Sequence, residues 1–171
     1  SRLTACQSTL TLNDTSVTKF EKNELIIKVF GNAIQNSFKF YDIENKNDNE
    51  LIGCSATNNG YEKKFGCTHR REIYIDKVKD CLRGTDHIIK KKDGYPVRYS
   101  FRFHINPELT VVKTMGGNGA LLQISKNKSL LFTIKNEEIK IEKSIFLGEK
   151  KSVDSACITI AGNLVNKNKS F

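Results

Sequence analysis

The chain has 171 residues, of which 38% are hydrophobic and 27% are charged, and its formal net charge at pH 7 is +9. This length suits one domain, or one domain with an extension, and the composition excludes a disordered chain. No apolar run reaches the roughly 20 residues that cross a bilayer, so we expect no membrane partner.

The N-terminal part of the chain is predicted to be strand-rich. Leu25–Phe30 and Ser37–Tyr41 are apolar and aromatic runs bounded by polar, turn-forming sequence, and we expect a hairpin or meander. An Asn-Asn-Gly turn ends at Gly60, and we place a module boundary there. Residues 1–60 are thus predicted to be a β-rich extension, and residues 61–171 a second domain.

One helix is predicted, within residues 75–84. Asp76 stands where a helix N-cap belongs, and Gly84 stands where a C-cap glycine belongs. The residues between them place an apolar stripe on one helical face, and the thiol in this stripe is expected to be buried. The stripe consists of Ile75, Val78, Cys81 and Leu82.

The most regular alternation in the sequence begins after Pro96. From Val97 to Ile105 apolar side chains alternate with polar ones, which predicts a strand with one apolar face and one cationic face. The cationic face carries Arg98, Ser100, Arg102 and His104. Such a face suits an anionic ligand. An equally weighted alternative is that its arginines pair with acidic neighbours across the sheet.

Several short apolar runs separated by turn residues predict further strands in the C-terminal half. They are Leu109–Lys113, Ala120–Ile124, Leu130–Ile134, Ile139–Ile145 and Ala156–Ile160. One helix that packs on an antiparallel sheet of this kind is an α+β fold.

The five cysteines show no spacing typical of a metal site, so no metal is expected, and no sequence motif calls for a cofactor. Their odd number leaves at least one thiol unpaired. Two disulfides and one free thiol in a secreted protein is the preferred interpretation, and a reduced cytosolic protein is the alternative. Cys6 and Cys54 bracket the N-terminal module and are a candidate pair.

Three short motifs occur in a distinctive order: Phe65-Gly66-Cys67 before the helix, Gly94-Tyr95-Pro96 at the start of the long strand, and Cys157 in the last strand. This order resembles the small fungal guanyl-preferring ribonucleases and, more closely, the ribonuclease-like secreted effectors of powdery mildew fungi. The resemblance covers residues 65–160. It implies a microbial-ribonuclease-like fold, with one main helix packed on an antiparallel sheet, and a disulfide between Cys67 and Cys157.

The residues that such ribonucleases use to move protons are missing. Val97 stands where the resemblance requires a histidine, and no histidine follows His104. Because this chemistry needs both an acid and a base, the chain is predicted not to be an enzyme. Tyr95, Arg98, Arg102 and His104 are left as candidates for binding RNA through base stacking and phosphate contacts.

The resemblance therefore implies a secreted fungal effector on an inactive ribonuclease scaffold, acting in the plant host cell. Its partners would be RNA or a host protein, with recognition by a plant immune receptor, and we expect a monomer. The alternative is an extracellular immunoglobulin-like adhesion or recognition domain. Strand density and three Asn-X-Ser/Thr sequons favour this alternative, whereas the absence of tryptophan disfavours it.

Overall fold

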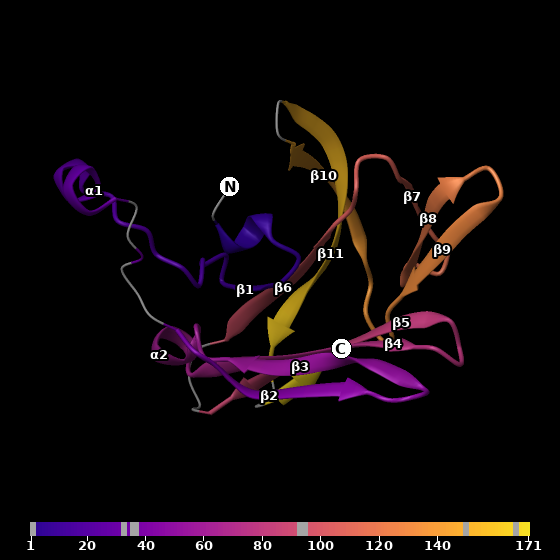
Figure 1. The fold of residues 1–171 in the computed structure, drawn as a ribbon, viewed down its shortest axis with the longest axis horizontal. Helices are drawn as coiled ribbons and strands as arrows, with labels where there is room; N and C mark the ends of the chain where they lie inside the picture. Colours follow the sequence, from indigo (N-terminus) through magenta and orange to yellow (C-terminus); the bar gives the residue numbers. More distant parts are fainter. Residues whose placement is uncertain (1–2, 32–33, 35–37, 92–95, 149–150, 166–167) are drawn as a thin grey trace. The chain divides into compact units, whose positions relative to one another are not determined.

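The computed structural model describes the whole chain except residues 1–2, 32–33, 35–37, 92–95, 149–150 and 166–167. Strands make up 58% of the residues and helices 9%. The fold is therefore nearly all β, with three antiparallel sheets (Figure 1). The chain divides into two compact units: unit 1 is Ser1–Ser16 with Arg98–Asn163, and unit 2 is Val17–Val97 with Leu164–Phe171. The predicted modules 1–60 and 61–171 do not coincide with these units.

Unit 2 contains a five-stranded sheet in the order β12-β5-β4-β3-β2. Its strands are β2 (Phe40–Asn47), β3 (Leu51–Asn58), β4 (Cys67–Asp76), β5 (Cys81–Lys90) and β12 (Asn168–Ser170). The first four follow one another along the chain and pair as neighbours, whereas β12 returns from the C-terminal end to pair with β5. Two short helices, α1 (Glu24–Phe30) and α2 (Glu62–Phe65), belong to the same unit.

Unit 1 contains a four-stranded sheet, β1-β6-β11-β10, and a three-stranded sheet, β7-β8-β9. Its elements are the 3₁₀ turn η1 (Thr4–Cys6), β1 (Leu10–Leu12), β6 (Val97–His104), β7 (Thr110–Lys113), β8 (Gly119–Ser125), β9 (Lys128–Thr133), β10 (Lys140–Leu147) and β11 (Ser152–Leu164). The apolar side chains of β1, β6 and β11 supply its core, and each of the larger ones is at most 1% exposed. They are Leu10, Leu12, Tyr99, Phe101, Ile158 and Ile160.

The C-terminal strands lie where the sequence predicts them. β6 begins at Val97 and buries Val97, Tyr99 and Phe101, as its alternation predicts. The five predicted runs between residues 109 and 160 correspond to β7, β8, β9, β10 and β11. The N-terminal strand predicted from Ser37 starts outside the described residues, and β2 begins at Phe40.

The predicted α+β fold, with its main helix within residues 75–84, is wrong. These residues end β4, form a tight turn and begin β5. Asp76 accepts a hydrogen bond from the Lys79 N–H at 2.9 Å, so its side chain caps a turn rather than a helix. The expected apolar stripe is not buried, because Val78 and Leu82 are 73% and 71% exposed.

The run Leu25–Phe30, predicted as a strand, is the helix α1. The Asn23 side chain accepts hydrogen bonds from the N–H groups of Leu25 and Ile26, which is N-capping, and Gly31 ends the helix with a φ of 74°. The run lacks the polar–apolar alternation of a half-buried strand. None of its residues is buried, and no helix in the described part of the chain is long and apolar enough to cross a membrane.

The structure contains no disulfide among the five cysteines, all of which are described as free thiols. The predicted Cys67–Cys157 and Cys6–Cys54 bridges are therefore absent. The two members of each pair belong to different units. Burial raises the pKa of both the Cys67 and the Cys157 thiol. Cys81, predicted to be a buried thiol on a helix, begins β5 and is only half-buried.

Candidate functional site

Arg98 and Arg102, two of the residues predicted to bind RNA, are both engaged by neighbours in unit 1. Arg98 forms an ion pair with Asp14, in the turn that follows β1. Arg102 donates a hydrogen bond to Thr11 Oγ1 at 2.8 Å, and its guanidinium lies 3.8 Å from Asp14. The structure thus matches the alternative reading of this strand, in which its arginines pair with an acidic neighbour on the adjacent element.

The remaining polar residues of this strand are also held by local contacts or lie outside the described part. His104 Nε2 donates to the Ala5 carbonyl at 3.1 Å, and its Nδ1 lies 3.0 Å from Ser144 Oγ. Tyr95 lies outside the described residues. Ser100 is 7% exposed, and among the described residues its buried hydroxyl alone has no hydrogen-bond partner.

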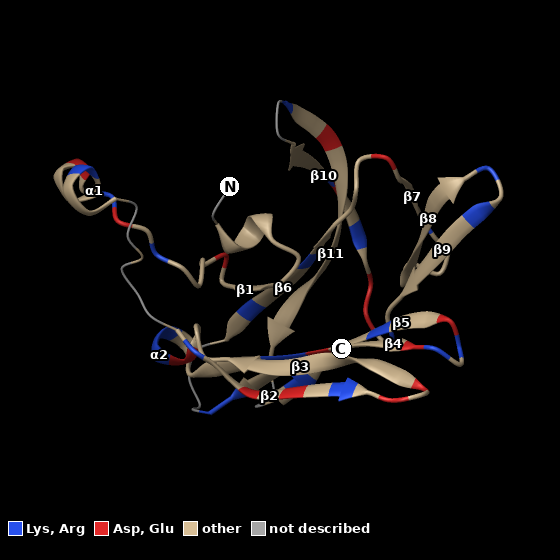
Figure 2. Ribbon diagram, in the orientation of Figure 1, with Lys and Arg blue, Asp and Glu red and all other residues tan. Residues whose placement is uncertain are grey.

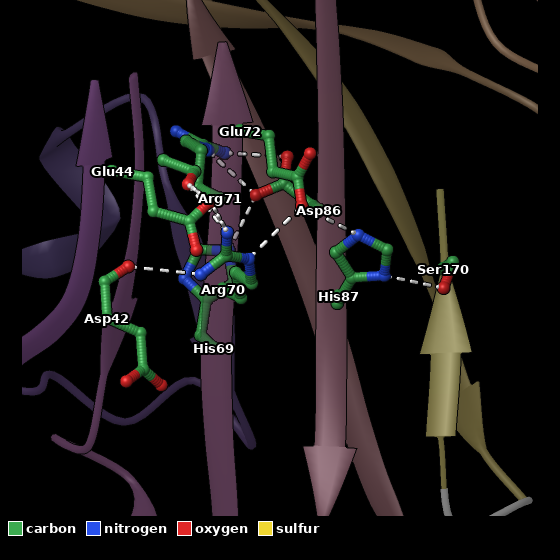
Figure 3. Close-up of polar contacts among 10 residues, drawn as sticks. Asp42, Glu44, His69, Arg70, Arg71, Glu72, Asp86, His87 and Ser170 are labelled. Atoms are coloured by element: carbon green, nitrogen blue, oxygen red, sulfur yellow. Dashed lines mark hydrogen bonds and ion pairs between the residues drawn. The ribbon is translucent and has the colours of Figure 1, made fainter. Parts of the chain in front are cut away.

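A buried charge cluster that the sequence did not reveal lies on the sheet of unit 2 (Figure 3). Arg71 in β4 stands directly opposite Asp86 in β5, so both side chains share one face. Asp86 accepts two hydrogen bonds from Arg71, at 2.7 and 3.0 Å, and one from His69 Nε2 at 2.6 Å. Burial alone raises the pKa of Asp86, but the hydrogen bonds from His69 and Arg71 outweigh it, so the pKa lies below its ordinary value.

A second cluster occupies the opposite face of the same sheet, centred on Arg70 (Figure 3). Its guanidinium donates to Glu72 at 3.1 Å, to Glu44 at 3.1 Å and to Ser55 Oγ at 2.6 Å. The hydrogen bond to Glu72, followed by the charge of Glu44, raises the pKa of Arg70. The Asp42 carbonyl accepts from the remaining guanidinium nitrogen at 3.1 Å. All three guanidinium nitrogens of Arg70 therefore donate hydrogen bonds to neighbours within its own unit.

His87 extends this second cluster to the C-terminal strand. Its Nδ1 lies 2.8 Å from Ser170 Oγ in β12, and its Nε2 lies 3.5 Å from Glu72 Oε1. Figure 3 shows this ring between β5 and β12. The two clusters are networks in which arginine charge is balanced by carboxylates. Within the described ranges, no three His, Cys, Asp or Glu side chains are grouped so as to hold a metal ion.

Lysine residues gather around α2 in unit 2 (Figure 2). We call this surface the α2 lysine patch; it consists of Lys39, Lys63, Lys64, Lys90 and Lys91. Lys63 and Lys64 belong to α2 itself, and Lys90 ends β5. No sign of this patch is visible in the sequence, because lysines are spread along the whole chain and the members of the patch come from three separate segments.

Backbone hydrogen bonds fix these three segments against one another. The Lys39 N–H donates to Asn59 Oδ1 at 2.7 Å, and the Asn59 N–H donates to the Lys39 carbonyl at 3.2 Å. The Lys91 N–H donates to the carbonyl of Gly66, the residue that ends α2, at 2.8 Å. The lysines are therefore carried by a backbone whose polar groups are already satisfied.

Among the described residues, two carboxylates, those of Glu62 and Asp42, act on a lysine of the α2 lysine patch. Glu62 lies 2.8 Å from Lys91 Nζ, and this hydrogen bond, with a smaller effect of Asp42, raises the pKa of Lys91. Lys64 Nζ lies 5.1 Å from the centre of the Phe65 ring, in cation–π geometry. All lysines of the patch except Lys90 are exposed, and ammonium groups in this arrangement suit a ligand with several sulfate or carboxylate groups.

Comparisons with known proteins give one family and one fold. The sequence model described as "Heparinase II/III-like, C-terminal" matches residues 1–171. The crystal structure of heparan sulfate lyase HepC from Pedobacter heparinus is similar, with a TM-score of 0.74 at 15% identity. The alignment covers 99% of this chain but 24% of that one, so the chain spans about a quarter of the lyase's length. No curated protein sequence matches the chain.

These findings overturn the ribonuclease-like effector as an interpretation. The family match extends over residues 1–171, whereas the resemblance rested on three short motifs within residues 65–160, of which Tyr95 is not described. The described part of this nearly all-β fold also has no main helix for those motifs to flank. The predictions of an inactive ribonuclease scaffold, of a host effector and of RNA binding depended on this interpretation and are wrong with it. The alternative, an all-β recognition domain, is nearer to the findings, although the family is not the immunoglobulin one.

Proposed function

The chain belongs to the Heparinase II/III-like, C-terminal family, and we propose that it is the polysaccharide-binding domain of a lyase-type protein. Its ligand is an acidic polysaccharide, sulfated or carboxylated, held at the α2 lysine patch. The observation that carries this proposal is the group of five lysines on the three described segments around α2, four of them exposed.

The chemistry of the patch fits a linear polyanion better than a small anion. Its ammonium groups are carried by α2 and by the ends of two neighbouring segments, so successive sulfates or carboxylates along a chain can each meet one. Each exposed ion pair contributes only up to about 1 kcal/mol, so useful affinity needs several of them together. Binding of this kind weakens as salt is added, because exposed charges are screened.

We propose further that this chain binds without cleaving. Elimination from an acidic sugar needs a base that removes a ring proton and an acid that protonates the leaving oxygen. His69 is 8% exposed and tied to Asp86, His87 lies between Ser170 and Glu72, and His104 is held by two contacts in unit 1. In this proposal the proton transfers belong to parts of a longer lyase outside these residues, and the protein acts outside the cytoplasm as a monomer.

The test is binding of heparin and of polygalacturonate to residues 1–171, measured by calorimetry at low salt. Lys63→Ala with Lys64→Ala should weaken binding roughly tenfold, as expected for the loss of two exposed ion pairs. The matched control is Lys126→Ala with Lys128→Ala, which removes two exposed lysines from the β8–β9 turn in unit 1. An equal loss in both double variants would contradict a localised site.

Cleavage is checked in the same samples by the ultraviolet absorbance of the unsaturated uronate that a lyase releases. We expect none from this chain alone. Release of that product, with its loss on replacing any one histidine, would show that the chain is catalytic and would overturn the non-cleaving part of the proposal.

A further inference from the structure

Unit 1 contains an open cavity of about 610 Å³ that the proposed function does not use. This volume is in the range of small-molecule sites. The loops before β8 and β10 form its walls, and one residue each of β10 and β11 completes it. Its polar and apolar lining includes Asn118, Asn136, Glu137, Glu138, Lys140 and Ala161.

The two loops that form the walls are fixed before any ligand arrives. The Ile134 N–H donates to the Asn118 carbonyl at 3.0 Å, and the Ile139 N–H donates to the Gly117 carbonyl at 3.0 Å. Gly117 has a φ of 78°, a left-handed conformation that favours glycine, and the Glu138 side chain lies over it. The loops are thus tied together at two points, which limits the ordering cost of binding.

One of the two carboxylates is also held from the core of the unit. The Tyr99 hydroxyl donates to Glu137 Oε2 at 3.2 Å, and the Tyr99 side chain is 1% exposed. Gly162 permits this arrangement, since a Cβ there would lie 2.5 Å from the Tyr99 hydroxyl oxygen. The carboxylate therefore has a set position at the cavity edge.

The polar groups of the lining are those that pair with sugar hydroxyls. A hydroxyl both donates and accepts, so it can donate to a carboxylate or amide oxygen and accept from an amide NH₂ or an ammonium group. Two amides, two carboxylates and one lysine provide all of these partners. Ala161 adds a small apolar surface that can contact the C–H groups of a sugar ring.

The charge of the lining selects against the acidic sugars proposed for the α2 lysine patch. Glu137 and Glu138 against Lys140 leave a net charge of −1, which repels a sulfate or carboxylate. We propose that this cavity is a separate binding site for an uncharged, hydroxyl-rich saccharide unit. It lies in the other unit of the chain and does not rest on the α2 lysine patch.

The test is a two-dimensional ¹H–¹⁵N NMR titration of the chain with two neutral probes, maltotriose and N,N′-diacetylchitobiose, and one acidic probe, trigalacturonate. A neutral probe should shift the amide signals of Asn118, Asn136 and Ala161, and trigalacturonate should leave them in place. Glu138→Gln and Asn118→Ala should each weaken binding roughly tenfold, as for a lost hydrogen bond to a polar ligand in a cavity. Glu108→Gln is the matched control, because Glu108 is an exposed glutamate of the same unit outside the lining.

Three results would overturn this inference. The first is that neither neutral probe shifts these signals, and the second is that only trigalacturonate does. The third is that Ca²⁺ shifts them while both neutral sugars do not, which would make the carboxylates a cation site. The Lys63→Ala, Lys64→Ala variant should bind the neutral probe as the parent chain does, so the two proposals can fail independently.

Discussion

Replacing Asp86 by alanine removes the carboxylate that joins Arg71 and His69 on the sheet of unit 2. Asp86 is 7% exposed and accepts three hydrogen bonds, two of them from one guanidinium. Bidentate pairs of this kind are among the stronger polar contacts in proteins. After the substitution, the positively charged Arg71 side chain remains in the sheet but has lost its ion pair with Asp86.

The expected loss of unfolding free energy is about 3 kcal/mol. Breaking a buried ion pair from one side costs about 3–5 kcal/mol, because the remaining charge is left poorly solvated. The Arg71 side chain is 22% exposed, so water can compensate part of this cost, which places the estimate at the low end of that range. A loss of this size is a large fraction of the 5–15 kcal/mol that stabilises a typical domain.

The assay is urea unfolding followed by far-ultraviolet circular dichroism, since the chain has no tryptophan for fluorescence. Glu62→Ala is the control, because it breaks only the exposed, solvent-screened ion pair with Lys91 and should change the unfolding free energy little. The reasoning is refuted if Asp86→Ala costs no more than Glu62→Ala. It is supported further if Arg71→Met restores stability to the Asp86→Ala chain.

Acid should weaken the same cluster. The pKa of Asp86 in the folded chain is below its ordinary value of 3.8, so the folded state holds its proton less tightly than the unfolded state does. The stabilisation is therefore complete above about pH 5 and is lost as the pH falls through the folded pKa. Asp86→Asn should flatten this part of the stability curve, and an unchanged slope would contradict the ionised pair.

Two further predictions concern other buried groups. Ser100→Ala should raise the unfolding free energy by about 1 kcal/mol, because it removes a buried hydroxyl that has no hydrogen-bond partner in the described part of the chain; a loss in urea unfolding would contradict this. In native protein, alkylation followed by mass spectrometry should modify the exposed Cys6 and Cys54 before the buried Cys67 and Cys157, and all should react after unfolding. Failure of Cys67 and Cys157 to react in denaturant without reductant would show a disulfide.

The strands that could be predicted are those whose pattern has a single physical reading. β6 alternates apolar and polar residues over its whole length, and only a half-buried strand has that period. Residues 75–84 have two readings, because an aspartate caps a helix and a turn with the same side-chain oxygen. The apolar spacing favours the helix, whereas the structure forms the turn, because β4 and β5 pair over ten residue pairs on either side of it. The local pattern of apolar residues carries no information about which strands pair.

The clusters of the candidate site were hidden for a related reason. Arg71 and Asp86 are 15 residues apart in sequence and meet only because the β4–β5 register places them opposite each other. Once the helix was predicted there, no hairpin was available to bring them together. β4 offers no polar–apolar alternation that could have revealed the pair, because residues 68–72 are five consecutive polar residues. The α2 lysine patch depends on three segments and had no signal in any one of them.

The interrupted sequence of unit 1 has a consequence for the order in which the chain folds. β4 and β5 form a hairpin of near neighbours, whereas β1 pairs with residues such as Phe101, across all of residues 17–97. Closing the longer loop has the greater entropic cost, so the hairpin should form first and the β1–β6 pairing late. During synthesis, Leu10 and Leu12 must wait, exposed, until most of unit 2 has been made. Pulsed hydrogen exchange should therefore find β4 and β5 amides protected before those of β1, and the reverse order would show that the N-terminal strand starts folding.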